Sequence, residues 1–362
     1  MIKKRRELAY KFSRRTNAQW KDLHWNSKLC AANLLQFIIL SVVILPLLRS
    51  EVLAQTRIVQ AIPTKSFGYL PLFVAQENGF YNDESLEVIS PVVRSAAALP
   101  GLLSGEIHFG SAESGMRVAM RGTPVKAIIF YYDRATWIFM GRPEIRSIRD
   151  LNGKNIAVNA LGAGADLTTR EILRSYGLQE KNYNLIALGQ DSQRILALIK
   201  NQVQATLLNP DSAAVAETQL DGIRRLAHSG DVQKTPFSGF VVTEKLLSEN
   251  RQLVKKFVRA TLKGIVLTRE QPQVAARVAE KIFGMKPEIA LSAVRNTIPS
   301  ISAKDPGGFT ETGISQFIMQ NAKQVGVKAE EIRISDIADL TLLREVQREL
   351  GLPCEGGYGC RR

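Results

Sequence analysis

The pattern of hydrophobic and polar positions divides this 362-residue chain into three stretches. Residues 1–54 hold a basic segment followed by an apolar run. From Arg57 to Thr243, short apolar segments that suit strands alternate with segments whose apolar residues follow a helical period. From Glu244 onward the apolar residues recur at helical spacing only, so we expect the last third to be helical and to pack on the first core.

Capping residues define the expected ends of the elements. Pro71 suits the first position of a helix, and Gly79 suits the left-handed cap that ends it. Asn201 fits the same kind of cap after a later helix. The alternation predicts an α/β fold with mostly parallel sheets covered by helices, repeated as two similar lobes. We expect strands at 57–62, 107–110, 125–131, 155–158, 184–188 and 205–208, and helices at 71–79, 96–104, 193–200, 272–283, 287–297, 310–325 and 338–350.

The first 54 residues have the layout of a secretory signal. Nine Lys and Arg residues precede the apolar run Leu34 to Leu48, and small or compact residues precede Ala54. This order of basic, apolar and small residues predicts export and cleavage after Ala54. Counted from Ala31 the run has 18 residues, slightly short of the roughly 20 that span a membrane. An uncleaved anchor is therefore the alternative, and it too leaves the body outside the cytoplasm.

Half of the formal net charge of +14 lies in the first 54 residues. Residues 1–54 carry ten Lys and Arg against three Asp and Glu, so half of the net charge belongs to the leader. The remainder is spread over some 308 residues without a block of like charges. Such a surface predicts no nucleic-acid partner and favours anionic small molecules only modestly.

Catalytic and metal-binding signals are few. Beyond the leader the chain has two histidines, His108 and His228, without cysteine or carboxylate at ligand spacing, so we expect no metal. The Gly-x-Ser-x-Gly pattern of nucleophilic hydrolases is absent. A Gly162-x-Gly164 pair follows the strand at 155–158, but Leu167 takes the third glycine position of a dinucleotide fingerprint. We therefore expect no cofactor and no enzymatic activity.

The candidate binding residues lie where strands end and helices begin, which is where open α/β sheets bind ligands. The backbone amides of Gly162 and Gly164, at the start of a helix, could bind an anionic ligand. The alternative is that these glycines only form the turn between strand and helix. Glu113 would oppose an anion if it faced a pocket, and a solvent-facing Glu is the alternative. An Asn or Asp that follows a strand can equally cap the next helix. The candidates are Ser66 to Tyr69, Ser111, Glu113, Ser114, Tyr132, Trp137, Gly162, Gly164 and Asn209.

Two cysteines remain after the leader, Cys354 and Cys360, in a segment with three glycines between them. Glycines let a short loop fold back on itself, and an oxidising compartment favours a disulfide. The alternative is two free thiols on a frayed tail.

At this point the chain resembles a known family, the solute-binding proteins of bacterial ABC importers of the nitrate/sulfonate/taurine and thiamine-pyrimidine-synthase-like type. The similarity spans about residues 56–285 and rests on the order and spacing of several segments rather than on one motif. The cysteine-rich signature of the thiamine-pyrimidine synthases is absent. The matching segments are Phe67 to Tyr81, Leu103 to Ile107, Ser147 to Lys154 and Gly239 to Thr243.

The resemblance implies a two-lobed type II periplasmic-binding-protein fold that closes over a small polar solute and delivers it to a membrane permease. A monomer is expected, working in the periplasm or outside the cell. A biosynthetic enzyme on the same scaffold and a membrane-tethered sensor are the alternatives. By this analogy lobe I is 55–135 with 240–350, lobe II is 136–239, and 351–362 is a tail. The implied ligand contacts are Ser66, Phe67, Gly68, Tyr69, Ser111, Glu113, Ser114, Tyr132, Gly162, Ala163, Gly164 and Asn209.

Overall fold

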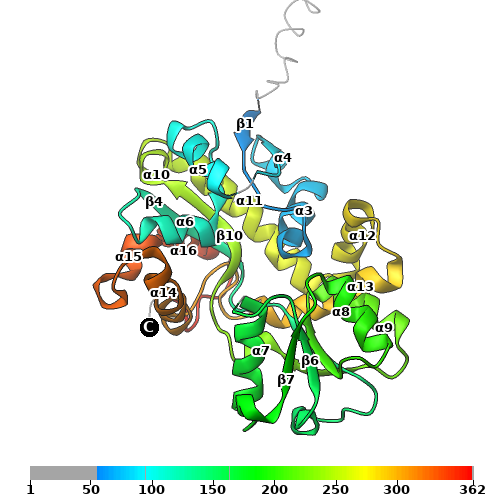
Figure 1. Cartoon of the computed structure of the whole chain (residues 1–362). Helices are drawn as coiled ribbons and strands as arrows, with labels where there is room; N and C mark the ends of the chain where they lie inside the picture. Colours follow the sequence, from blue (N-terminus) through cyan, green and yellow to red (C-terminus); the bar gives the residue numbers. More distant parts are fainter. Residues whose placement is uncertain (1–54, 94, 163, 361–362) are drawn as a thin grey trace, which may run out of the picture. The chain divides into compact units, whose positions relative to one another are not determined.

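The computed structural model describes residues 55–93, 95–162 and 164–360 (Figure 1). The predicted leader and the predicted contact at Ala163 lie outside these residues. In the part that the structure describes, no helix combines the length and the apolar character that a membrane crossing requires.

The first sheet system contains five strands, joined as two groups. β1 (Thr56–Val59) pairs in parallel with β2 (Leu86–Ile89), and β3 (Gly110–Ser111) pairs with β10 (Phe237–Thr243), which in turn pairs with β4 (Val125–Tyr132). A parallel bridge between Gln60 and Phe109 joins the groups. The spatial order is therefore β2-β1-β3-β10-β4. We call this sheet system and the helices packed on it lobe I.

The second sheet has the order β7-β6-β8-β5-β9. Its strands are β5 (Ile138–Gly141), β6 (Asn155–Val158), β7 (Asn184–Ala187), β8 (Ala205–Leu208) and β9 (Arg224–His228). With its helices we call it lobe II. β6 pairs in parallel with β7 and β8, whereas β5 runs antiparallel to β8 and β9. The two lobes thus share one strand order, as the repeated strand–helix pattern predicted.

The antiparallel strands were not anticipated from the sequence. β5 enters lobe II directly from β4, and β10 returns to lobe I directly from β9. Each crossing strand is inserted next to last in the sheet it enters, and it runs against its neighbours because it comes from the other lobe. Two segments, 133–137 and 229–236, therefore connect the sheets.

Helices cover both sheets and follow the predicted positions closely. α11 packs along α3, and a Cβ at Gly264 would overlap the backbone there, so glycine permits the close approach. The lobe II helices are α7 (Gly164–Ser175), α8 (Asp191–Ile199) and α9 (Pro210–Gln219). The others are α3 (Leu70–Glu77), α4 (Phe80–Asp83), α5 (Ser95–Ser104), α6 (Ala112–Ala119), α10 (Glu244–Glu249), α11 (Arg251–Glu270), α12 (Pro272–Phe283), α13 (Pro287–Thr297), α14 (Glu311–Val325), α15 (Ile334–Ile337) and α16 (Thr341–Glu349).

The helical third does not pack on lobe I alone. α12 lies against α3 of lobe I, but α13 packs along α9 of lobe II (Figure 1). Ser292 of α13 donates a hydrogen bond to Glu217 at 2.8 Å, and the amide of Asn296 donates to the carbonyl of Pro210 at 3.2 Å. α13 therefore links the two lobes in addition to the crossing segments.

One predicted strand begins later than expected. The strand predicted at 107–110 is β3 at Gly110–Ser111, preceded by a bend and by the single bridge at Phe109. The imidazole Nδ1 of His108 accepts a hydrogen bond from the amide of Val59 at 3.1 Å. The side chain thus takes the place of a strand partner.

The predicted disulfide between Cys354 and Cys360 is confirmed, with a Cα–Cα distance of 5.4 Å. The loop that it closes packs on lobe I, where the Tyr358 ring stacks on Phe309 with centroids 5.6 Å apart. The Tyr358 carbonyl accepts hydrogen bonds from Arg344, a buried residue of α16. The tail is therefore an ordered part of the protein rather than a frayed end.

Candidate functional site

The predicted site residues gather where helices begin after parallel strands. In lobe I the short helix η1 (Phe67–Tyr69) leads into α3 after β1, and α6 begins directly after β3. In lobe II α7, α8 and α9 begin after β6, β7 and β8. Because parallel strands end at one edge of a sheet, each lobe presents its helix starts along one edge.

Tyr69 anchors the lobe I side of the site. It is 3 % exposed, and its ring packs edge-on against Tyr131 with centroids 5.9 Å apart. Burial raises the pKa of the Tyr69 phenol far above its ordinary value, and the nearby charge of Glu113 adds to the rise. The phenol therefore stays protonated at any physiological pH and acts as a neutral hydrogen-bonding group.

Glu113 is neither a free pocket carboxylate nor a solvent-facing one. Its Oε2 accepts a hydrogen bond from the Ser111 hydroxyl at 3.0 Å, and its Oε1 accepts one from the amide of Ser238 at 2.6 Å. Ser238 lies in the crossing strand β10 with φ +48°, a left-handed conformation that costs a non-glycine residue about 1–2 kcal/mol. Glu113 thus fixes a strained point of the crossing strand to the start of α6.

Aromatic side chains continue the site along the crossing segments. The Tyr132 hydroxyl donates to the carbonyl of Phe67 at 3.3 Å. The Phe237 ring lies 6.3 Å from the Tyr132 ring and 6.0 Å from the Trp137 ring, centroid to centroid. A Cβ on Gly68 would come within 3.5 Å of Phe237 and 3.1 Å of the Ser238 hydroxyl, so the loop after β1 lies directly against β10.

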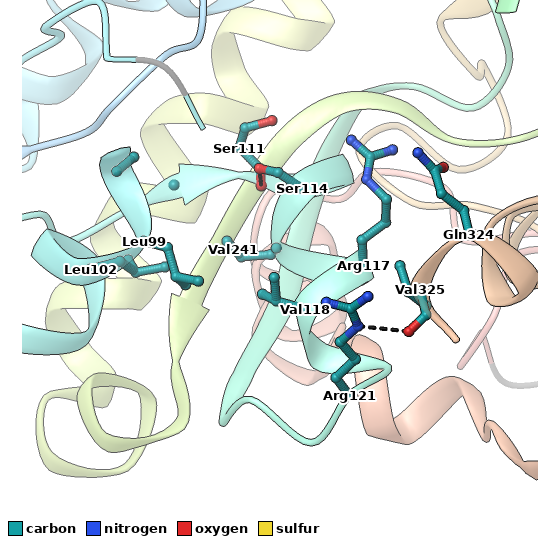
Figure 2. A pocket seen from close by; sticks show the side chains of 13 residues that line it. Leu99, Leu102, Ser111, Ser114, Arg117, Val118, Arg121, Val241, Gln324 and Val325 are labelled. Atoms are coloured by element: carbon teal, nitrogen blue, oxygen red, sulfur yellow. Dashed lines mark hydrogen bonds between the residues drawn. The ribbon is translucent and has the colours of Figure 1, made fainter. Parts of the chain in front are cut away.

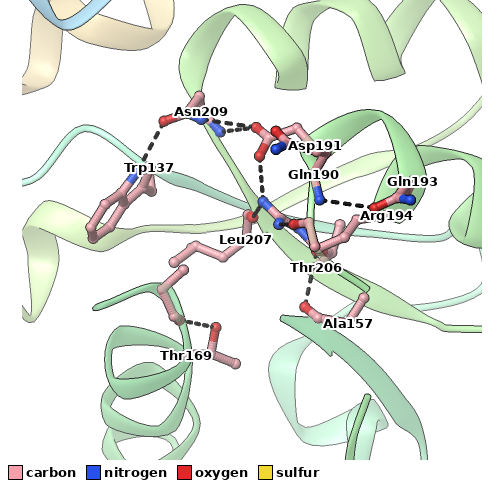
Figure 3. A network of polar contacts seen from close by, with 12 residues as sticks. Trp137, Ala157, Thr169, Gln190, Asp191, Gln193, Arg194, Thr206, Leu207 and Asn209 are labelled. Atoms are coloured by element: carbon pink, nitrogen blue, oxygen red, sulfur yellow. Dashed lines mark hydrogen bonds and ion pairs between the residues drawn. The ribbon is translucent and has the colours of Figure 1, made fainter. Parts of the chain in front are cut away.

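On the lobe II side, a polar network holds Trp137 (Figure 3). The indole Nε1 donates to Asn209 Oδ1 at 3.0 Å. The backbone and side-chain amides of Asn209 donate to Asp191 Oδ2 at 2.9 and 3.0 Å. Asp191 forms an ion pair with Arg194, whose side chain also donates to the carbonyls of Gly189 and Leu207. Trp137 therefore has a fixed orientation at the start of lobe II.

The ion pair in this network is deeply set. Arg194 is 3 % exposed, and burial lowers the pKa of its guanidinium while the Asp191 charge opposes that shift. Its Nε has no hydrogen-bond partner among the described residues. A buried guanidinium of this kind is held by its partners, so the network depends on the carboxylate of Asp191 and on the two carbonyls.

The glycine loop before α7 was expected to offer its backbone amides to a ligand, but one of these amides bonds within the protein. The amide of Gly162 donates to the carboxylate of Asp166 at 2.7 Å, and Asp166 also pairs with Arg170. A carboxylate of the protein thus occupies the position predicted for an anionic ligand. Gly164 remains at the site, since a Cβ there would lie 3.7 Å from the Trp137 ring.

The structure joins most of the predicted residues into one line of contacts. The line runs from Ser66 to Tyr69 through β10 and Trp137 to Asn209. Ser114 is different, because it lines a separate cavity on α6 (Figure 2). The sequence analysis missed Phe237, Ser238, Asp191 and Arg194, and only the Gly239 segment next to the first two carried a signal.

Within residues 55–360 as described, one group of three potential metal ligands occurs, Asp305 with Cys354 and Cys360. Both sulfur atoms are used in the disulfide, and the Asp305 carboxylate is paired with Arg344. These side chains are therefore committed to structure.

The shared strand order, the crossing strands and the site at the helix starts define a type II periplasmic-binding-protein fold. Solved structures of this class agree. The aliphatic sulphonate-binding protein SsuA from Escherichia coli matches with a TM-score of 0.57 at 16 % identity, over 74 % of this chain and 90 % of that one. The nitrate-binding protein NrtA from Synechocystis matches with a TM-score of 0.59 at 12 % identity, over 84 % of this chain and 91 % of that one.

The family is shown by its model, "NMT1/THI5 like", which matches residues 66–275, and the chain belongs to this family. A curated relative, the riboflavin-binding protein RibY from Chloroflexus aurantiacus, is 25 % identical over 218 residues. That match covers 57 % of this chain and 60 % of the relative, so the chain spans about three fifths of the relative's length. The structural neighbours are mainly solute-binding components of ABC importers, and the family also includes biosynthetic members.

Proposed function

We propose that this protein is the extracytoplasmic solute-binding component of an ABC importer and captures a small solute between its lobes. The observation that carries the proposal is the line of aromatic and polar contacts from Tyr69 through Phe237 to Trp137 and Asn209. It passes over a crossing segment and reaches helix starts of both lobes, so one solute there would touch both. Binding energy would then stabilise a closed arrangement.

The chemistry of the line favours a planar, uncharged solute over a small inorganic anion. The half-buried rings of Phe237 and Trp137 offer faces for stacking, which suits an aromatic heterocycle. The guanidinium that supports this line, Arg194, is buried and paired with Asp191, so it offers no free positive charge to an anion. Riboflavin, which the relative RibY is named for, fits this description better than nitrate does. We therefore propose a flavin-like or pyrimidine-like solute.

Binding without catalysis is supported by the two histidines of the described chain. His108 Nδ1 accepts from the amide of Val59, and His228 Nδ1 accepts from the amide of Gly230. The His228 Nε2 lies 3.4 Å from the Ser300 hydroxyl. Both imidazoles are engaged in local structure, so neither is poised as a general base for a solute.

For the domains, we propose lobe I as 55–135 with 240–350, lobe II as 136–239, and 351–362 as a disulfide-closed tail that packs on lobe I. α13 is the exception within lobe I, since its hydrogen bonds to α9 would carry it with lobe II when the lobes close. We propose further that residues 1–54 direct export, by cleavage after Ala54 or as an anchor. The intact mass of the exported protein distinguishes these two outcomes.

The test uses protein that begins at Gln55, in which Trp137 is the single tryptophan, since the other two lie at positions 20 and 25. Titration with riboflavin, a hydroxymethylpyrimidine, an alkanesulfonate and nitrate is followed by Trp137 fluorescence. Solution scattering of the same samples reports compaction. We expect quenching and compaction with an aromatic heterocycle and neither with nitrate.

A matched pair of variants assigns the site. Phe237→Ala removes a stacking face and should weaken binding about tenfold. Tyr176→Ala removes an exposed aromatic residue just after α7 and should change nothing. Absence of both quenching and compaction across the panel contradicts the proposed function, and turnover of the bound solute would indicate the biosynthetic alternative.

A further inference from the structure

A cavity lies in lobe I, on the side of α6 that faces α5 and the end of α14 (Figure 2). Its volume is about 290 Å³. A water molecule occupies roughly 30 Å³ in the liquid, so the space suits about ten non-hydrogen atoms. The cavity is formed by lobe I alone, and its existence does not depend on how the lobes open or close.

The floor of the cavity is apolar. Leu99 and Leu102 of α5 face Val118 of α6 and Val241 of β10 across it. Gly115 allows this arrangement, because a Cβ at that position would overlap the side chain of Val241. The absent side chain lets α6 press onto β10 and leaves the apolar surface open beside it.

Two arginines line the same cavity, Arg117 in the last turn of α6 and Arg121 in the turn just after the helix ends at Ala119. Arg117 donates to Asn321 Oδ1 at 3.3 Å, and Arg121 donates through Nε to the carbonyl of Val325 at 2.7 Å. A guanidinium has five N–H donors, so most of their donors are not used by these contacts. Neither arginine has a carboxylate within ion-pair distance among the described residues.

The two arginines bring two positive charges to the wall of one cavity. An anion in the cavity would be attracted to both guanidinium groups. On α11, by contrast, Lys255 and Arg259 share the carboxylate of Glu349. At Arg117 and Arg121 the described chain supplies no negative counter-charge. An anion from outside the protein would supply it.

From this geometry we propose that the cavity binds a small amphipathic carboxylate, whose charged head meets Arg117 and Arg121 and whose short apolar body lies on Leu102 and Val118. The site is separate from the proposed solute site. It is nevertheless adjacent, because Ser111 and Ser114 at the start of α6 line the cavity while Ser111 also holds Glu113. An occupant here is therefore placed to bias the α6 end of the solute site.

The probe is octanoate, which has ten non-hydrogen atoms, titrated calorimetrically into protein that begins at Gln55. Octanol tests the apolar body without charge, and acetate and inorganic phosphate test charge without the body. We expect octanoate to bind at least about tenfold more tightly than any of the three, since both parts of the cavity must be used. Equal binding of octanol or of phosphate overturns the proposal, as does absence of octanoate binding.

Variants locate the binding. Arg117→Gln with Arg121→Gln should weaken octanoate binding at least about tenfold. Val118→Asp, which places a carboxylate on the floor, should abolish it. The control Arg277→Gln removes an exposed charge from α12 and should leave binding unchanged. Undiminished binding in the double variant overturns the assignment. Calorimetric titration of the Phe237→Ala protein then separates the two sites, because octanoate binding should survive that substitution.

Discussion

Substitution of Arg194 by methionine should destabilise lobe II and release Trp137 at the same time. Methionine keeps much of the length of the side chain and removes the guanidinium. The Asp191 carboxylate then loses its ion pair, and the carbonyls of Gly189 and Leu207 lose a donor. Removing one partner of a buried pair costs about 3–5 kcal/mol, mostly because the remaining charge is stranded.

The exposure of the two partners narrows this range. The side chain of Arg194 is 4 % exposed, whereas that of Asp191 is 19 % exposed. Water can therefore solvate part of the stranded carboxylate, and we expect the lower end, about 3 kcal/mol. In a protein of this size the same loss lowers Tm by roughly 5 °C.

The assay is urea unfolding of protein that begins at Gln55, followed by far-UV circular dichroism and by Trp137 fluorescence. The emission of the folded variant should shift to the red, because Asn209 is held less firmly and the indole gains access to water. Adding Asp191→Asn to the variant removes the stranded charge and should recover part of the lost stability.

An exposed arginine provides the control. Arg333 pairs with Asp336 while its side chain is 81 % exposed, so Arg333→Met should leave the unfolding midpoint unchanged. The reasoning is refuted if Arg194→Met unfolds within about 1 kcal/mol of the parent, or if both arginine variants lose equal stability.

Three further outcomes are expected. Replacing Cys354 and Cys360 by serine should lower the free energy of unfolding by about 2 kcal/mol, given their separation of six positions; a reductant should do the same to the parent in urea titrations, and a further effect of reductant on the variant would contradict this. Gly239→Ala places a Cβ on the carbonyl of the paired strand β4, so its thermal midpoint should fall far below that of the parent, by more than about 3 kcal/mol of stability; a normal midpoint would show that the crossing strands tolerate separation. Burial lowers the pKa of His108 and His228 below the ordinary 6.5, so the unfolded chain binds more protons than the folded one and stability should fall as pH drops below about 6.5; His228→Asn should flatten the plot of Tm against pH, and an unchanged slope would count against this assignment.

Much of the secondary structure followed from local signals. The helices predicted at 272–283 and 287–297 are α12 and α13 with the same bounds, because proline begins each one. Asn201 has the predicted left-handed conformation, with φ +55°. Where a prediction failed, a tertiary contact was responsible, as when the His108 imidazole capped β1 and delayed β3.

Only part of the candidate site could be predicted from the sequence. Residues 66–69 and Asn209 follow strands in the sequence, so their place at the sheet edge was predictable. Phe237 was not, since a single aromatic residue at the start of a strand gives no sign of facing Trp137. The cavity at Arg117 was also hidden, because it depends on α5 and α14, which are more than two hundred residues apart in the chain.

The sequence by itself determined the basic, apolar leader, the alternation of strands and helices, and the loops from which a site is built. These features depend on residues a few positions apart, so they can be recognised in the sequence alone. Only the tertiary structure decided that β5 and β10 cross between lobes, that α13 packs on α9, and that Glu113 holds Ser238. Such contacts join residues that are distant in sequence, and they form because folding brings their apolar surfaces together, which no local pattern specifies.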